Sequence, residues 1–195
     1  MKGFRIHTEE TAGEPANRIL KDVRKNLGFV PNLFAVFAES TPALQANVAM
    51  KGQLARTSLT PMERELVQIV TSVENRCGYC VAGHSTFAAM QNLPAEPIAA
   101  VRAGRPVSDD RLEALRCFTE ALVRRRGHLD DDQVQKFYAA GYGPEQLLEV
   151  ILAVCVKMFA NLTNNVIGIP LDEQFSSYAW EPASDVTDSG NSRAA

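Results

Sequence analysis

Apolar runs long enough to cross a membrane are lacking in this sequence. No run approaches the ~18 apolar residues that a membrane span requires, and residues 1–15, MKGFRIHTEETAGEP, lack the apolar centre of a signal peptide. We therefore expect a soluble, cytoplasmic protein with no membrane partner. Cysteine is also scarce, with 4 among 195 residues. In a reducing compartment two neighbouring cysteines are more often catalytic or metal-binding than bridged for structure.

An excess of positive charge is lacking too, which argues against a nucleic-acid partner. The chain has 20 lysines and arginines against 23 aspartates and glutamates, a formal net charge of −3, whereas nucleic-acid-binding domains carry basic patches. The three consecutive arginines at 124–126 precede Gly127 and suit the end of a helix. No motif for a flavin, a haem or a nucleotide is present, so we expect no cofactor.

Sustained period-2 alternation is absent, whereas signals for helix starts and ends are frequent. The clearest is Thr60, Pro61 and Glu63, which together predict a capping box at the start of a helix. We predict an all-α fold of about eight to ten helices. The length suits a single domain, which we place at residues 1–180. Residues 181–195 are small, polar and aperiodic, and we expect them to be a disordered tail.

A weak internal repeat accompanies the helical pattern. A shift of 84 residues (149 − 65 = 84) aligns three pairs, which are Glu65 with Glu149, Cys77 with Asn161 and Cys80 with Asn164. The alignment suggests a duplicated helical unit in which only the first copy has the thiols. Chance is the alternative, because apolar patterns of helices align easily with one another.

The stretch ENRCGYCVAGH, residues 74–84, brings two cysteines and a histidine together. At ~100° per residue, Cys77, Cys80 and His84 fall within an arc of about 60° on one helical face. His84 lies one turn beyond Cys80 and two turns beyond Cys77. The spacing therefore pairs the histidine with Cys80, whose proton it can accept.

A helix break before this motif would bring a carboxylate to the histidine. Asn75 is a good N-cap and Gly78 is a poor residue for a helix interior, so we expect a boundary between residues 74 and 78. Around such a break, Glu65 lies ~15 Å before the turn and His84 ~13 Å after it. In an antiparallel hairpin the two side chains meet, and the dipole at the second helix start would lower the pKa of the Cys77 thiol.

These residues resemble a known family. Glu65, eleven further residues and then Cys77-x-x-Cys80-x-x-x-His84 resemble the signature of the alkylhydroperoxidase D-like, carboxymuconolactone decarboxylase superfamily, and the likeness extends over about residues 15–175. The resemblance implies an all-α fold with an internally duplicated helical core. It also implies homo-oligomers, whether dimers, trimers or hexamers, and reduction of hydroperoxides by a thiol-dependent peroxidase of peroxiredoxin type.

The resemblance also implies a role for each residue of the motif. Cys80 would be the attacking thiol and Cys77 the resolving thiol, with Glu65 and His84 as the proton relay. An external dithiol, of thioredoxin or lipoyl type, would reduce the resulting disulfide. One position departs from the family, since Tyr79 stands where the best-studied members have a second histidine, and a phenol with a pKa near 10 cannot act as a base at neutral pH.

Beside a purely structural role for the motif, two alternatives to peroxide reduction remain open from the sequence. Two thiolates, an imidazole and a carboxylate are a legitimate zinc ligand set, although Glu65 suits a position behind His84 better than one on a metal. A lactone decarboxylase is the other alternative, suggested by the name of the superfamily. Members with that lactone chemistry typically lack the cysteine pair.

Four further residues are interpreted as lining the site or packing in the core. Tyr79 and Glu74 are possible site-lining residues, and Glu74, three residues before Cys77, would as an anion raise the pKa of that thiol. Cys117 and Cys155 lie in apolar helical patterns, and we expect both to be buried packing residues.

Overall fold

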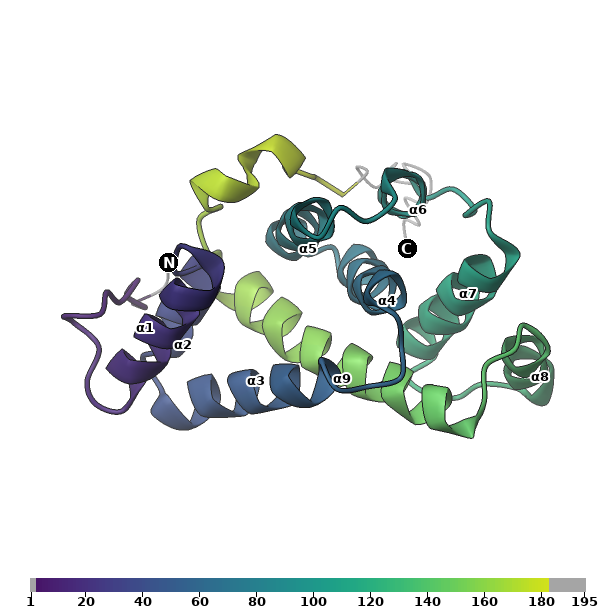
Figure 1. Ribbon diagram of the computed structural model, residues 1–195, viewed down its shortest axis with the longest axis horizontal. Coiled ribbons are helices and arrows are strands. Elements are labelled where there is room, and N and C mark those ends of the chain that lie inside the picture. The colour runs from purple at the N-terminus through teal and green to yellow at the C-terminus, as the bar shows by residue number, and fades with distance from the viewer. Residues whose placement is uncertain (1–2, 183–195) are drawn as a thin grey trace, which may run out of the picture.

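Helix α4 (Pro61–Glu74) lies at the centre of the structure, with the other helices around it (Figure 1). The computed structural model describes residues 3–182, and no β-strand occurs in that range. The other elements are α1 (Ala16–Leu27), α2 (Asn32–Phe37), α3 (Thr41–Leu54), α5 (Gly78–Met90), α6 (Ala95–Arg102), α7 (Asp110–Arg124), α8 (Asp131–Ala139), α9 (Pro144–Ile167) and the 3-10 helix η1 (Glu173–Tyr178). The predicted all-α fold is confirmed. Most of the expected disordered tail, residues 183–195, lies outside the described range.

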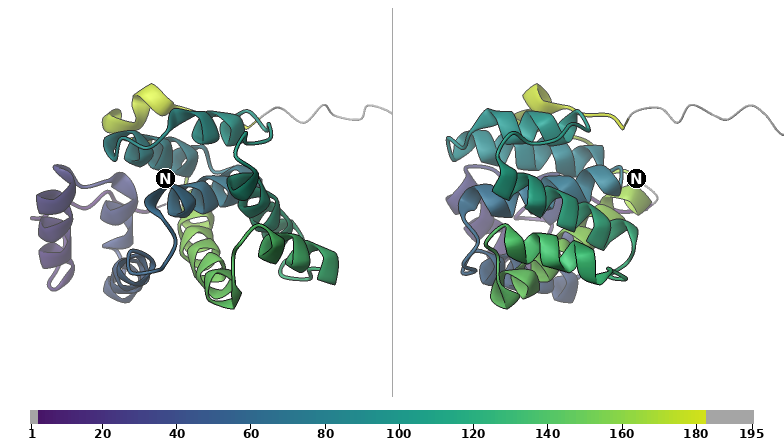
Figure 2. Two further views of the ribbon diagram at one scale, coloured as in Figure 1. Left: turned by 45° about the vertical axis from the view of Figure 1, so that its right-hand side comes forward. Right: turned by 90° about the vertical axis from the view of Figure 1, so that its right-hand side faces the viewer.

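Two buried apolar clusters hold the helices together. Helix α4 packs against α5, α6, α7 and α9, and one cluster fills the space among these helices with residues such as Leu66, Ile69, Phe118 and Val150. The second joins α1, α2 and α5 to the C-terminal segment through residues such as Leu20, Phe34, Cys80 and Phe175. Each fully buried large apolar side chain contributes ~1.5–3 kcal/mol. Figure 2 shows α1 and α2 to one side of α4, and α7 and α8 to the other.

The start of α4 is fixed by the predicted capping box. Thr60 Oγ1 accepts a hydrogen bond from the backbone N–H of Glu63 at 3.2 Å, and the Glu63 carboxylate accepts one from the backbone N–H of Thr60 at 2.7 Å. Such a cap typically contributes about 1 kcal/mol. Its presence sets the register of α4 and therefore the direction of Glu65, two residues later.

The chain reverses between α4 and α5 over three residues, within the window expected from the sequence. Asn75 was expected to cap α5, but it ends α4 instead, because its side-chain amide donates back to the last turn of that helix. Arg76 takes the left-handed conformation, with φ of 54°, and Cys77 becomes the N-cap of α5. Gly78 then begins α5 where a Cβ atom would lie 2.5 Å from the backbone oxygen of Trp180. Only glycine fits that approach.

Helix α9 is the longest element and has two different faces. Its buried face, which includes Val150, Val156 and Lys157, packs on α3 and α4. Leu162 and Val166 on its other face are more than half exposed. By length and composition alone α9 is long and apolar enough to cross a membrane, and core helices of soluble proteins often meet the same two criteria. In its most apolar 18-residue stretch, 44% is buried inside the protein. The expectation that no segment reaches membrane-spanning length is therefore wrong for α9.

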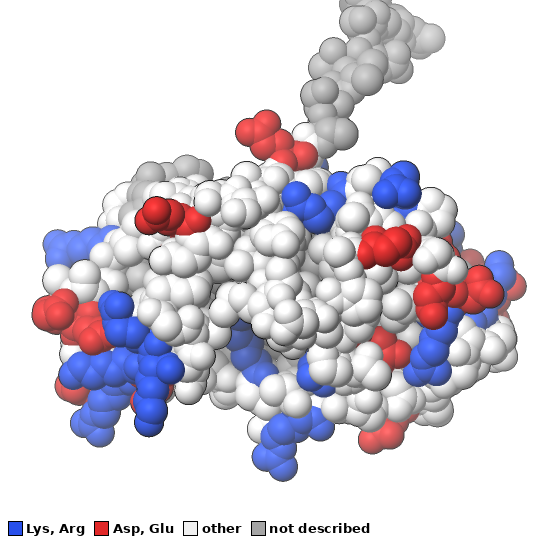
Figure 3. Space-filling model, turned by 45° about the horizontal axis from the view of Figure 1, so that its top comes forward, with Lys and Arg blue, Asp and Glu red and all other residues white. Residues whose placement is uncertain are grey.

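The 84-residue repeat is preserved only in part. Helix α4 aligns with the first part of α9, but α9 runs without interruption to Ile167, so the break between α4 and α5 has no counterpart there. Figure 3 shows charged side chains of both signs at the left and right ends of one face, and a mostly uncharged surface with several basic side chains between them.

Candidate active site

The two cysteines of the motif are free thiols buried at the start of α5. Cys77 is 0% exposed and Cys80, one turn later, is 2% exposed. Their side chains are hydrogen-bonded to each other. Cys80 also lines a cavity of about 20 Å³, which is room for little more than one molecule of the size of water. The cavity is therefore the place where a small reactant could meet a sulfur atom.

The surroundings of the two thiols separate their pKa values. Burial raises the pKa of Cys80, but the hydrogen bond from Cys77, the charge of Lys157 and a hydrogen bond from Asn161 outweigh it and lower the pKa to about 6. The hydrogen bond to Cys80, burial and the charge of Cys80 all raise the pKa of Cys77. Cys80 is thus the more readily ionised of the two thiols. The helix start does not make Cys77 the more acidic thiol.

Glu65 and His84 meet across the α4–α5 hairpin, as their similar distances from the turn predict. Glu65 Oε2 lies 2.7 Å from His84 Nδ1, and Gln91 Nε2 donates to the other carboxylate oxygen at 3.1 Å. Burial and the charge of Lys157 lower the pKa of His84 to about 4. The imidazole is therefore neutral at pH 7, with its proton on the nitrogen that faces the carboxylate.

Lys157 is a residue of the candidate site that lies outside the sequence motif. It comes from α9, is 1% exposed, and its Nζ lies 2.6 Å from His84 Nε2. Because an ammonium group only donates, the lone pair of His84 Nε2 accepts this hydrogen bond. The available signal was that Lys157 is the one charged residue in the apolar stretch VILAVCVKMFANL, residues 150–162.

The expected contact between His84 and Cys80 is not present. Among residues 3–182 no hydrogen bond joins the two side chains, since both ring nitrogens of His84 are engaged, one by Glu65 and the other by Lys157. The cations that lower the pKa of the thiol are Lys157 and, to a smaller extent, Lys51, and the hydrogen bond from Cys77 lowers it more than either. His84 is thus hydrogen-bonded to the lysine and not to Cys80, which corrects the pairing inferred from helical spacing.

Lys51 is a second cation at the cavity that the sequence did not reveal. It comes from α3, its Nζ lies 5.0 Å from the centre of the Phe34 ring, and burial and Lys157 lower its pKa to about 8. Phe34, Lys51, His84 and Phe87 line both the cavity and a wider groove of about 450 Å³. The groove therefore leads toward Cys80 past these four side chains.

Tyr79 lines the cavity with its ring but does not present its hydroxyl to it. The hydroxyl donates to Asp172 Oδ2 and accepts from the backbone N–H of Leu33. Burial and the charge of Asp172 raise its pKa. Asp172 in turn accepts from the backbone N–H of Asn32. Tyr79 therefore ties α2 to the C-terminal segment and does not replace the base that the family has at this position.

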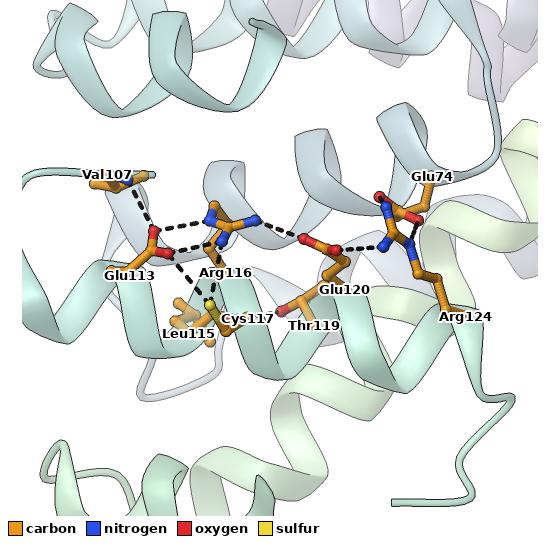
Figure 4. A network of polar contacts seen from close by, with 9 residues as sticks. All are labelled: Glu74, Val107, Glu113, Leu115, Arg116, Cys117, Thr119, Glu120 and Arg124. Carbon is orange, nitrogen blue, oxygen red and sulfur yellow. Dashed lines mark hydrogen bonds and ion pairs between the residues drawn. The ribbon is translucent and has the colours of Figure 1, made fainter. Parts of the chain in front are cut away.

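Glu74 does not line the candidate site, contrary to expectation. Figure 4 shows it facing Arg124 of α7, with which it makes contacts of 2.5 and 3.1 Å. The same series of ion pairs continues through Glu120 to Arg116. The expectation was wrong because Glu74, although close to Cys77 in sequence, points from the side of α4 that faces α7.

Cys117 and Cys155 are exposed rather than buried. On α9, both neighbours of Cys155, Val154 and Val156, are buried while the cysteine between them faces outward. On α7, Cys117 lies beside Arg116 and donates to Glu113 (Figure 4). Successive residues of a helix point about 100° apart. A cysteine whose chain neighbours are apolar and buried can therefore face the solvent, and the expectation of burial was wrong for both cysteines.

The arrangement is unsuited to zinc. Among the described residues no three of His, Cys, Asp or Glu are grouped as ligands for a metal. The nitrogen of His84 that would bind a cation already faces the Lys157 ammonium at 2.6 Å. A second cation at that point would be repelled.

The low pKa of His84 predicts that the fold weakens in mild acid. Its folded pKa of about 4 lies below the ordinary 6.5, so as pH falls the unfolded chain takes up the proton first. Stability is then lost between pH 6.5 and 4, by about 3 kcal/mol for this group. Urea unfolding measured across this range should show the loss.

The matched control is the exposed His128. Replacing His84 by glutamine should flatten the pH dependence between 6.5 and 4, whereas His128→Gln should leave it as in the parent protein. Equal slopes in all three proteins would contradict the assignment of His84 as a histidine held neutral.

Comparison with known proteins agrees with the fold and with the family resemblance. Residues 42–121 match the model of the carboxymuconolactone decarboxylase family. This segment contains Glu65, both motif cysteines and His84, whereas Lys157 lies outside it. The resemblance identified from the sequence is thereby confirmed. No curated protein is significantly similar to the chain in sequence.

Several solved structures share the fold. An alkylhydroperoxidase AhpD core, a peroxidase-related protein of Ralstonia eutropha JMP134, has a TM-score of 0.78 at 20% identity over 88% of this chain and 93% of that chain. A peroxidase-related protein of Silicibacter sp. TM1040 has 0.77 at 16% over 89% and 92%. The debrominase Bmp8 has 0.70 at 17% over 84% and 89%. At such identities the likeness establishes the alkylhydroperoxidase D-like fold, and the chemistry must be argued from the residues.

Proposed function

We propose that this protein is a thiol-dependent hydroperoxide reductase in which Cys80 attacks the peroxide and Cys77 resolves the product. The observation that carries the proposal is the difference between two adjacent buried thiols. Cys80 has a pKa of about 6 and borders a cavity, whereas the pKa of Cys77 is raised. One thiol is thus ready as a nucleophile while the other stays protonated beside it.

In the first step the Cys80 thiolate attacks the terminal oxygen of the hydroperoxide. An S–O bond forms as the O–O bond breaks, the sulfur loses two electrons, and the remaining oxygen leaves as an alkoxide or hydroxide that must gain a proton. The cavity of about 20 Å³ has room for the narrow peroxide end of such a molecule. Any larger organic part would extend into the groove.

In the second step the Cys77 sulfur attacks the sulfenic acid on Cys80. The S–S bond forms, hydroxide leaves and is protonated to water, and Cys77 loses its proton. The hydrogen bond between the two side chains supports this step, because the sulfurs are already adjacent. An external dithiol then reduces the disulfide by exchange. Since both sulfurs are buried, a dithiol on a slender arm, of lipoyl type, fits the groove better than a thioredoxin surface.

The lactone decarboxylase alternative receives less support. It gives no role to two hydrogen-bonded thiols, nor to the lowered pKa of one of them. A lactone decarboxylase would work equally well without either sulfur. Replacing Cys80 therefore distinguishes the two reactions, because it should abolish peroxide reduction and leave a lactone decarboxylation unchanged.

The test is a count of thiols before and after one equivalent of hydroperoxide per chain. Cys117 and Cys155 are exposed, so both are first replaced by serine, and the protein is treated with a chelator. We expect loss of both remaining thiols, with a disulfide between residues 77 and 80 identified by peptide mapping. Thiols that stay intact under peroxide would contradict the proposal.

A further inference from the structure

Lys157 is a charged group at the cavity that helps to lower the pKa of Cys80, but the two thiol steps described above give it no part in moving protons. Its side chain is 1% exposed, it lines the cavity together with Cys80, and its ammonium donates to His84 Nε2 at 2.6 Å. A buried cation costs several kcal/mol unless anions and hydrogen bonds compensate it. Its position therefore depends on the charges that surround it.

Those charges cancel only while Cys80 is ionised. The cations are Lys157 on α9 and Lys51 on α3, the anions are the Cys80 thiolate on α5 and Glu65 on α4, and His84 between them is neutral. Oxidation turns the thiolate into a neutral sulfenic acid and leaves one buried positive charge in excess. Loss of one proton from a lysine restores neutrality.

Of the two lysines, Lys157 is the one whose position suits the loss of a proton when Cys80 is oxidised. Burial and Lys157 lower the pKa of Lys51 to about 8, but its side chain lies against the ring of Phe34 and borders the open groove, where it has access to water and can exchange its proton with solvent. Lys157 has no such access. Its hydrogen bond to His84 fixes the ammonium at the cavity.

We propose that Lys157 is the acid–base residue of the cycle, giving a proton to the departing oxygen and later taking one from Cys77. This inference rests on the peroxide reduction proposed above and adds a catalytic residue to it. In the first step the thiolate takes the terminal oxygen with its hydrogen, the alkoxide leaves, and a proton of the Lys157 ammonium converts it to the alcohol. Lys157 is then a neutral amine beside a neutral sulfenic acid.

The neutral amine serves the steps that follow. It accepts the proton of Cys77 as that sulfur attacks Cys80, and returns it to the departing hydroxide, which leaves as water. When an external dithiol reduces the disulfide, the amine takes the proton of the Cys80 thiol. The thiolate and the ammonium are thereby restored together, and no proton is gained or lost over the cycle beyond those of the substrates.

His84 and Glu65 act here as positioning residues. The Glu65 carboxylate holds the proton of the imidazole on Nδ1, so that Nε2 keeps the lone pair that orients the lysine. Because burial and Lys157 lower the pKa of His84 to about 4, the imidazole does not take the proton itself at neutral pH. The relay expected from the sequence thus supports the lysine and does not touch the thiol.

The experiment varies how strongly the leaving group needs a proton. In the protein whose exposed cysteines are serine, single-turnover rates are measured with tert-butyl hydroperoxide, which expels a strongly basic alkoxide, and with peracetic acid, which expels a weakly basic carboxylate. Iodoacetamide, whose leaving iodide needs no proton, reports the thiolate fraction of each variant. Each peroxide rate is divided by that fraction.

We expect Lys157→Met to slow tert-butyl hydroperoxide by about 10² or more after this correction, and peracetic acid by less than about 10-fold. Lys51→Met, the matched loss of a cation, should slow both oxidants by one common factor. Lys157→Gln, which keeps a partner for His84, should repeat the Lys157→Met pattern and serves if the methionine variant does not fold. Equal factors for both oxidants in the Lys157 variants would overturn the inference. An unmodified protein inert to both oxidants would instead overturn the proposed function.

Discussion

Replacing Cys80 by serine is expected to abolish fast peroxide consumption, by at least about 10³-fold, because the nucleophile of the first step is lost. Cys77→Ser should behave differently. It keeps the Cys80 thiol and Lys157, and the serine hydroxyl can donate the hydrogen bond that the Cys77 thiol donates, so one equivalent of peroxide should still be consumed, with a sulfenic acid left on Cys80. The two substitutions remove the same chemical group from neighbouring positions, and only the surroundings of the sulfur differ.

The measurement is a rapid-mixing peroxide assay on each single-cysteine protein, followed by trapping with a dimedone-type probe. A probe adduct on Cys80 in the Cys77→Ser protein is the expected product. Should the protein that keeps only Cys77 react faster than the one that keeps only Cys80, the assignment of roles is reversed. The helix start, and not the lysine, would then control the reactivity of the thiols.

Replacing Glu65 by glutamine is expected to destabilise the fold by about 3–5 kcal/mol. The substitution keeps the shape and an oxygen that can accept from His84 Nδ1, but it removes one of the anions that compensate two cations at the cavity. The side chains of Glu65 and His84 are only 10% and 6% exposed, so water cannot replace the lost charge. Urea unfolding at pH 7.5 gives the change in free energy.

Glu74 on the same helix provides the matched control. Its partner Arg124 is 62% exposed, and an ion pair of this kind contributes at most about 1 kcal/mol. Glu74→Gln should therefore leave the unfolding midpoint almost unchanged. Similar losses in the two variants would show that the charges at the cavity are not compensating one another as described.

The helical architecture follows from local signals in the sequence. The capping box joins Thr60 to Glu63, three positions later, and it forms in the structure with the expected partners. The break between α4 and α5 is also local, and it lies between Glu74 and Gly78. Once the break was placed, the 1.5 Å rise of a helix was enough to bring Glu65 level with His84. Their contact of 2.7 Å was therefore predictable without the tertiary structure.

What surrounds the thiols was decided by tertiary packing alone. Lys157 reaches His84 from 73 positions away in the chain, and Asp172 reaches Tyr79 from 93. No local rule of capping or periodicity connects residues so far apart. The sequence therefore determined which side chains share the α4–α5 hairpin. The packing of α9 against it placed Lys157 where, together with the hydrogen bond from Cys77, it lowers the pKa of Cys80 in place of the histidine, because electrostatic interactions depend on distance in space and on burial.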